Sequence, residues 1–162
     1  MIVGWLKDRL RARPARTARL RPADASALAR IHAEAFARPW DAHDLERMLA
    51  DPAMLADGIF MGASARPMGF ALSRQVLDEA EILTIVVTRK AQGRGLGRTL
   101  LAAHLAHLAA NGAKTLFLEV EENNTPAIAL YRRFGFTDAG RREGYYQRTH
   151  TSRAALVLRR SL

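Results

Sequence analysis

The stretch Gln92-Gly-Arg-Gly-Leu-Gly-Arg98 determines how the rest of the chain is interpreted. Before it comes Ile82-Leu-Thr-Ile-Val-Val87, whose β-branched residues predict a buried central strand. After it, leucines at helical spacing predict a helix over residues 96–110. Small residues in a turn between a strand and a helix let backbone N–H groups approach an anion, and the helix dipole favours negative charge there. The sequence therefore predicts an anion site at this turn.

The glycine pattern excludes two common classes of phosphate-binding loop. Arg94 and Arg98 can pair directly with a phosphate. No Gly-Lys-Ser/Thr follows, which excludes a nucleoside-triphosphate loop. A dinucleotide loop needs a third glycine, but counting from Gly93 or from Gly95 puts Arg98 or Leu100 there. The alternative is a glycine-rich turn without a ligand.

The remaining apolar patterns predict a single mixed sheet with helices. We expect a strand at residues 18–22, helices capped by Asp24 and Asp41, strands at 59–63 and 68–72 joined by a hairpin, a strand at 114–120, a helix capped by Asn124 that ends at Gly135, and strands from Phe136 and over 154–158. With the central strand and its helix, the order is βααβββαβαββ. The predicted fold class is mixed α/β.

Length and composition indicate one globular domain. The 162 residues are 49% hydrophobic and 25% charged, as in ordinary globular proteins. We expect a basic N-terminal extension over residues 1–17 and one domain over 18–162. The apolar start of the chain is too short for a signal peptide, and no run is long enough for a membrane span. The absence of cysteine excludes disulfides and thiolate sites and fits the cytoplasm.

The net charge of +9 is unevenly distributed. Residues 1–21 hold seven bases and one acid, whereas residues 22–131 hold ten bases and thirteen acids. Residues 132–162 again are basic. Because a nucleic-acid-binding domain carries a continuous basic face, we expect no direct nucleic-acid binding. The acidic middle instead suits a basic partner.

At the glycine loop the sequence resembles the GNAT acetyltransferases, whose signature is Gln/Arg-x-x-Gly-x-Gly/Ala after a central strand. The resemblance implies a GNAT fold, with a split mixed sheet flanked by helices, and acetyl-coenzyme A as co-substrate. It implies that the loop amides bind the pyrophosphate and that the preceding strand pairs with the pantetheine arm. Asn124 would contact the coenzyme as well as cap its helix. The implied coenzyme-binding residues are Ile85, Val86, Val87, Gln92, Gly93, Arg94, Gly95, Leu96, Gly97, Arg98 and Asn124.

Other segments resemble the RimI-type protein N-terminal alanine acetyltransferases within that family. These segments are 76–80, 118–120, 127–136 and Arg141-Arg-Glu-Gly-Tyr-Tyr146, with Ala35-Phe36 and Pro39-Trp40. The resemblance covers roughly residues 18–160. It implies acetyl transfer to the α-amine of a protein N-terminus, an alanine of a small-subunit ribosomal protein.

Acetyl transfer to an amine needs a base, a donor for the departing thiolate and a group that stabilises the thioester oxygen. Glu119 lies near a strand end and is the base that the resemblance implies. The alternative is that Glu119 is only a solvated carboxylate, since Glu121 and Glu122 follow it at the same strand end. A partly buried glutamate has a raised pKa that suits a base. The resemblance assigns proton donation to Tyr131, which on composition alone is an aromatic packing residue. We expect the oxygen to meet a backbone N–H near Val87.

His104 and His107 lie three residues apart on the leucine-rich helix. Without a third ligand or a His-Glu-x-x-His spacing they do not predict a metal site. We interpret them as surface or groove histidines and expect no metal. No Gly-x-Ser-x-Gly elbow is present, so a serine hydrolase is excluded.

Several functions stay open on the sequence. An α-amine acceptor would enter past Trp40 and Tyr145 or Tyr146, residues that equally suit packing at a rim. The enzymatic alternative is a small-molecule or lysine acetyltransferase of the same fold. The non-enzymatic alternative is an acyl-coenzyme A-binding interaction module. We expect a monomer or weak dimer.

Overall fold

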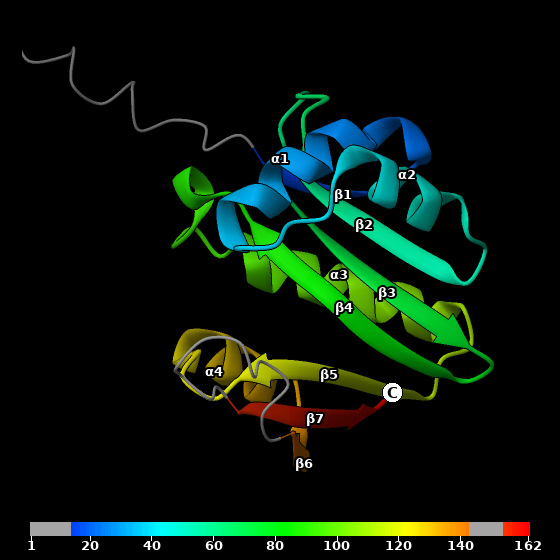
Figure 1. The fold of residues 1–162 in the computed structure, drawn as a ribbon, viewed down its shortest axis with the longest axis vertical. Helices are drawn as coiled ribbons and strands as arrows, with labels where there is room; N and C mark the ends of the chain where they lie inside the picture. Colours follow the sequence, from blue (N-terminus) through cyan, green and yellow to red (C-terminus); the bar gives the residue numbers. More distant parts are fainter. Residues whose placement is uncertain (1–13, 143–153) are drawn as a thin grey trace, which may run out of the picture.

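The structure, a computed structural model, describes residues 14–142 and 154–162. Its seven strands form one sheet in the order β1-β2-β3-β4-β5-β7-β6 (Figure 1). The strands are β1 (Ala15–Arg19), β2 (Met54–Met61), β3 (Gly69–Val76), β4 (Glu79–Val87), β5 (Thr115–Glu121), β6 (Thr137–Arg142) and β7 (Ala155–Ser161). Neighbouring strands pair antiparallel except β4 and β5, which are parallel. The mixed sheet predicted from the sequence is confirmed.

Two helices cover each face of the sheet. The helices are α1 (Ala25–Ala35), α2 (Ala42–Ala50), α3 (Leu96–Ala110) and α4 (Thr125–Arg133), with short 3-10 turns at Pro22–Asp24 and Arg89–Ala91. Leu28 of α1 and Leu45 of α2 share a core with Phe70 of β3, and Figure 1 shows both helices in front of the sheet. Leu101 of α3 and Tyr131 of α4 share the core of the other side. We call these sides the α1/α2 face and the α3/α4 face.

The order of elements agrees with the prediction, whereas several boundaries differ. β1 begins at Ala15, so residues 15–17 lie in the sheet rather than in the predicted extension. β2 begins at Met54, ahead of the predicted residue 59, because its first half pairs with β3 although Asp57 interrupts the apolar pattern. β4 begins at Glu79, because Glu79 pairs with both Val76 and Thr115. At Arg16 and Glu79, which are exposed, pairing with a neighbouring strand rather than burial places the residue in the sheet, and an apolar pattern does not record pairing.

A β-bulge in β4 lies where β4 and β5 stop pairing. Ser73 of β3 pairs with Ile82 and Leu72 pairs with Thr84, so Leu83 is the extra residue. The bulge switches the face of the side chains: Ile82 packs in the α3/α4 core, whereas Val86 packs in the α1/α2 core. The parallel pairing of β4 with β5 also ends at Ile82. Beyond this point the two strands separate, as the GNAT resemblance implies.

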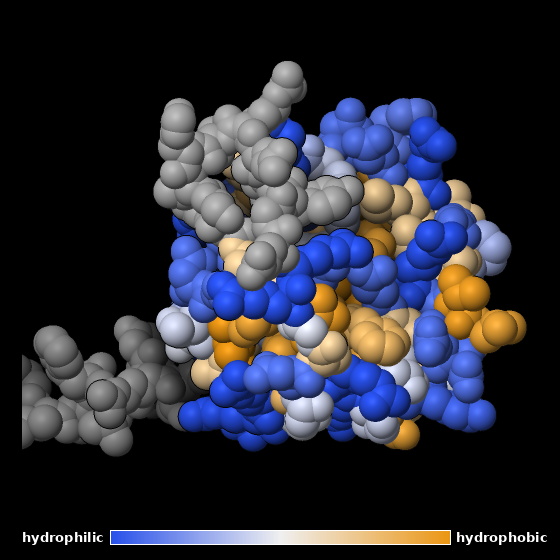
Figure 2. Space-filling model, turned by 60° about the horizontal axis from the view of Figure 1, so that its bottom comes forward, coloured by the Kyte–Doolittle hydropathy of each residue, from blue (hydrophilic) through white to orange (hydrophobic). Residues whose placement is uncertain are grey.

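The outer surface is mixed in character. In Figure 2, several apolar patches lie among hydrophilic residues on the face drawn there. Such a mixture is normal for a globular protein. Among the described residues, none of the helices is both long and apolar enough to cross a membrane.

Candidate active site

The separated ends of β4 and β5 bound a cleft of about 410 Å³. Its lining comes from α1, β4, the start of α3, β5 and α4: Ala35, Phe36, Ile82, Leu83, Thr84, Ile85, Val86, Val87, Gly97, Leu118, Glu119, Val120, Glu121, Asn124, Ala127, Leu130 and Tyr131. The structure therefore brings together seven of the predicted site residues from four separate elements, namely Ile85, Val86, Val87, Gly97, Glu119, Asn124 and Tyr131. Past Ile82, the β5 side of β4 faces the cleft instead of a strand.

The glycine loop has the backbone geometry of an anion site. Gly93 and Gly95 have φ values of 74° and 75°, the left-handed region that favours glycine. Gly95 is the N-cap of α3, and the first intrahelical bond runs from the N–H of Thr99 to its carbonyl at 3.1 Å. The amides before Thr99 consequently have no partner within the helix. A Cβ added at Gly93 or Gly95 would meet no atom within 4 Å, so the space beside the loop is open.

Some side chains of the glycine loop anchor it to the protein, and others are exposed to solvent. The Nε2 of Gln92 donates to the carbonyl of Val87 at 3.1 Å, which ties the loop to the end of β4. Leu96 is buried in the core, so only its backbone can meet a ligand. Arg94 and Arg98 are exposed. An open loop of amides flanked by two arginines, beside a strand edge that faces a cleft, fits the pyrophosphate and pantetheine parts of acetyl-coenzyme A.

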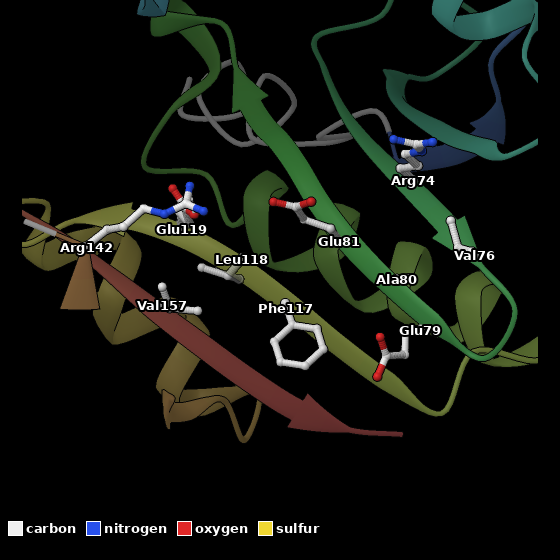
Figure 3. Close-up of a pocket in the computed structure, with 10 residues that line it drawn as sticks. All are labelled: Arg74, Val76, Glu79, Ala80, Glu81, Phe117, Leu118, Glu119, Arg142 and Val157. Atoms are coloured by element: carbon white, nitrogen blue, oxygen red, sulfur yellow. Dashed lines mark ion pairs between the residues drawn. The ribbon is translucent and has the colours of Figure 1, made fainter. Parts of the chain in front are cut away.

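Glu119 lies on β5 just beyond the last residue paired with β4. Its side chain is 38% exposed and lies on the α1/α2 face of the sheet, because its neighbours Leu118 and Val120 pack in the α3/α4 core. Its Oε1 lies 2.8 Å from a guanidinium nitrogen of Arg142 on β6 (Figure 3). The ion pair with Arg142 therefore orients the Glu119 carboxylate. The sequence alone assigns Arg142 no role, because β6 is separated from β5 by β7 in the sheet.

Tyr131 is both a packing residue and a polar group of the cleft. It is 7% exposed and its ring meets Phe136 edge-on at 5.7 Å. Burial raises the pKa of Tyr131 to about 12. The phenol therefore stays protonated around neutral pH and can act as a hydrogen-bond donor.

Asn124 is the helix cap that the sequence predicts, and it also lines the cleft. Its Oδ1 accepts from the N–H of Ala127 at 3.3 Å. Glu122, by contrast, forms an ion pair with Arg141 at 2.9 Å and does not line the cleft. Of the three neighbouring acids, Glu119 and Glu121 reach the cleft.

The connection between α1 and α2 is fixed by a stack of three rings. His32 stacks on Phe36 at 4.2 Å and on Trp40 at 4.5 Å, and its Nδ1 accepts from the Trp40 N–H at 3.1 Å. Phe36 is 42% exposed and lines the cleft, whereas Trp40 packs against the α1/α2 core. Of the three stacked rings, Phe36 is thus the one that lines the cleft. Tyr145 and Tyr146 lie outside the described residues.

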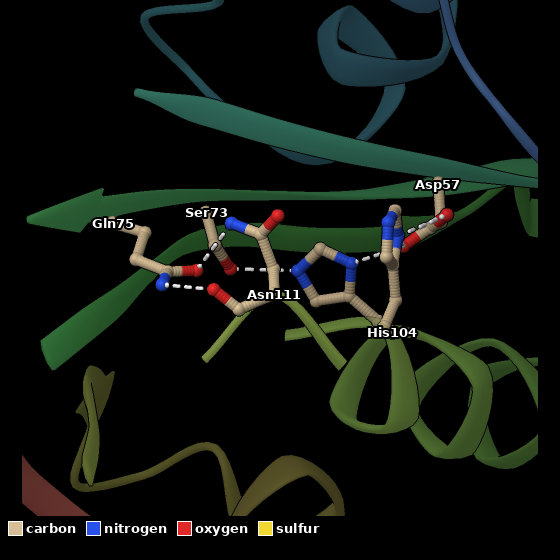
Figure 4. A network of polar contacts seen from close by, with 6 residues as sticks. Asp57, Ser73, Gln75, His104 and Asn111 are labelled. Atoms are coloured by element: carbon tan, nitrogen blue, oxygen red, sulfur yellow. Dashed lines mark hydrogen bonds and ion pairs between the residues drawn. The ribbon is translucent and has the colours of Figure 1, made fainter. Parts of the chain in front are cut away.

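The interpretation of His104 as a surface or groove histidine is wrong. His104 is 0% exposed, with its Nδ1 2.6 Å from Asp57 Oδ2 and its Nε2 2.6 Å from the hydroxyl of Ser73 (Figure 4). His107 contacts the same carboxylate at 3.0 Å. Asp57, an acid within the buried strand β2, was the signal for this network. The network lies between α3 and the sheet and outside the cleft.

Three comparisons place this geometry among known proteins. The sequence profile of the acetyltransferase (GNAT) family matches residues 25–136. The [Ribosomal protein bS18]-alanine N-acetyltransferase of Salmonella typhimurium is 41% identical over 96 residues, which span 59% of this chain and 65% of that protein. The mycothiol acetyltransferase of a Nocardioides species is 34% identical over 138 residues, which span 72% of this chain and 47% of that protein.

The fold comparison agrees. The crystal structure of the ribosomal-protein-S18-alanine N-acetyltransferase from Escherichia coli superposes with a TM-score of 0.81 at 32% identity, covering 90% of this chain and 92% of that one. The family profile matches more than half of the chain, and the glycine loop, the bulged strand and the cleft all lie within the matched residues. The chain belongs to the GNAT family of acetyltransferases.

Proposed function

We propose that this chain transfers an acetyl group from acetyl-coenzyme A to the N-terminal α-amino group of a protein, an alanine of a small-subunit ribosomal protein. One observation carries the proposal: a single cleft between separated strands presents a carboxylate, Glu119, and a protonated phenol, Tyr131. The Salmonella and Escherichia coli relatives are alanine N-acetyltransferases of a ribosomal protein, which supports this acceptor.

Each part of acetyl-coenzyme A has proposed binding residues at the glycine loop, on β4 or at the start of α4. The amides from Gly93 to Arg98 would hold the pyrophosphate, and the two arginines of that loop would add direct pairing. The backbone of Ile85–Val87 would pair with the pantetheine arm, and Asn124 would contact it from the start of α4. When bound, acetyl-coenzyme A supplies the acetyl thioester.

The polar groups of the cleft divide the proton transfers between them. Glu119 would take the proton of the acceptor amine, and the Tyr131 phenol would donate a hydrogen bond to the departing sulfur. A backbone N–H near Val87 would stabilise the thioester oxygen. Each of these roles needs only groups that line the cleft.

The choice of an α-amine follows from the strength of the base. An α-amine has a pKa of about 7.7–8.0, against about 10.4 for a lysine side chain. At about 1.36 kcal/mol per pKa unit, the α-amine loses its proton at a cost lower by about 3 kcal/mol. A side-chain carboxylate such as that of Glu119 is a modest base, and it suits the α-amine better than lysine.

A second function is favoured by a specific observation. The mycothiol acetyltransferase relative is aligned over a larger share of this chain than the ribosomal-protein enzyme of Salmonella. A small-molecule amine is therefore the alternative acceptor.

The test offers the enzyme three acceptors with acetyl-coenzyme A: an alanine-initiated peptide that lacks lysine, the same peptide blocked at its N-terminus with an internal lysine added, and a small primary amine. Mass spectrometry locates the acetyl group. We expect the first peptide to be acetylated at its α-amine, with little product from the others. Faster acetylation of the blocked peptide or of the small amine would reject the α-amine acceptor, and binding of acetyl-coenzyme A without any product would favour the interaction module.

A ribosomal-protein acceptor supports the predicted cytoplasmic location, because ribosomes translate in the cytoplasm. Direct nucleic-acid binding is not required by this reaction. The predicted monomer or weak dimer is tested by analytical ultracentrifugation.

A further inference from the structure

A second cavity opens beside Glu119 on the α1/α2 face of the sheet, with a volume of about 490 Å³ (Figure 3). Its lining comes from strands β3 to β7: Arg74, Val76, Glu79, Ala80, Glu81, Phe117, Leu118, Glu119, Arg142 and Val157. It shares Leu118 and Glu119 with the cleft between β4 and β5. The cavity is thus next to the place where the proposed reaction occurs, on the face away from the glycine-loop helix α3.

The position of Glu81 follows from strand alternation. Ala80 and Ile82 pack in the α3/α4 core, so Glu81 between them points to the opposite face. On β5, Leu118 and Val120 pack in that same core, so Glu119 also points to the α1/α2 face. Glu81 is one residue before the last β4–β5 pair and Glu119 is one residue after it. Figure 3 shows both side chains on the same side of the two strands.

The charges around the cavity distinguish the two carboxylates. Glu119 is paired with Arg142 at 2.8 Å. Arg74 lies opposite Glu81 in the β3–β4 register, yet no ion pair of Glu81 is found among the described residues. Glu81 is therefore the carboxylate near the cleft whose charge is available to an incoming cation.

We propose that Glu81 binds the protonated α-amine of the acceptor and so sets acceptor affinity, while Glu119 accepts the proton. The inference rests on the proposed function. An α-amine with a pKa of about 7.7–8.0 arrives mostly as ammonium at neutral pH. An ammonium held by a carboxylate on β4 is directed to the gap that opens between β4 and β5, where Glu119 stands. Without Glu81, Arg74 and Arg142 leave the cavity less favourable to a cation.

The decisive variants are Glu81→Gln and its matched control Glu79→Gln. Glu79 lies on the same face of the same strand and lines the same cavity, two residues further from the cleft. With the alanine-initiated peptide, we expect Glu81→Gln to raise the acceptor KM by about 10- to 100-fold, the effect of losing a hydrogen bond between charged groups. The kcat and the KM for acetyl-coenzyme A should stay within about threefold of wild type, since one charge-assisted contact is removed before the chemical step. Glu81→Asp should restore part of the acceptor affinity.

The outcomes separate the inference from the function on which it rests. If the wild-type enzyme acetylates no α-amine, the proposed function fails. If it acetylates the peptide and Glu81→Gln behaves like Glu79→Gln, the inference alone is wrong. A loss confined to kcat would also overturn it, because Glu81 would then act in proton transfer rather than in binding.

Discussion

Removing the Asp57 carboxylate should destabilise the fold strongly, although Asp57 lies outside the cleft. This carboxylate meets His104 Nδ1 at 2.6 Å and His107 Nδ1 at 3.0 Å. Asp57→Ala leaves the ring of His104, which is fully buried, with a polar nitrogen that water cannot reach. Removing one partner of a buried pair costs about 3–5 kcal/mol. For a domain of this size each kcal/mol lowers Tm by about 2–4 °C, so Tm should fall by about 6–20 °C.

The stability that the Asp57 carboxylate contributes should also depend on pH. Burial alone raises the pKa of Asp57, but the hydrogen bonds from His104 and His107 outweigh it and hold the pKa below the ordinary value of 3.8. The unfolded state therefore binds a proton more readily than the folded state. The contribution of this group is fully present above pH 3.8 and is lost as the pH falls through the folded pKa.

Urea unfolding followed by circular dichroism gives the free energy of unfolding for wild type and Asp57→Ala at pH 7. The control is Glu46→Ala, which removes an exposed carboxylate from α2 and should change stability by no more than about 0.5 kcal/mol. A triple variant, Asp57→Val, Ser73→Ala and His104→Leu, should recover most of the loss, because it replaces the whole polar chain by apolar groups. An Asp57→Ala variant within about 1 kcal/mol of wild type would refute the reasoning, because a buried unpaired nitrogen costs more than that.

Three further predictions address the site. Gly95→Glu places a charged side chain in the loop, at a position with φ 75°. Calorimetry should then detect no binding of acetyl-coenzyme A, while circular dichroism shows a retained fold. Unchanged affinity would reject the loop as the coenzyme site. Glu119→Gln should lower kcat by about 10²–10⁴ with coenzyme affinity unchanged in calorimetry, and activity within a few-fold of wild type would make Glu119 a solvated carboxylate. Burial lowers the pKa of His32 below 6.5, so the folded state should lose stability as the pH falls below 6.5; thermal unfolding should show this loss in wild type and a flatter profile in His32→Gln, which no longer titrates there.

The order of the elements and the anion loop were determined by the sequence itself, because their causes are local. Helical spacing, β-branched runs and caps act over a few residues, and Asp41 caps α2 as predicted, accepting from the Asp44 N–H at 2.8 Å. Gly93 and Gly95 take positive φ, as a tight turn before a helix requires. The family could be predicted from the sequence because its signature is also local, lying in one contiguous loop.

The tertiary structure alone decided which side chains share a cavity and which charges meet. β7 enters the sheet between β5 and β6, which brings Arg142 of β6 to Glu119 of β5. The bulge at Leu83 ends the pairing of β4 with β5 and leaves Glu81 and Glu119 on either side of that point. His104 is buried because β2 and β3 supply Asp57 and Ser73 beneath α3. Pairing between strands that are distant in sequence leaves no periodic trace in any one of them, so only the assembled sheet fixes these contacts.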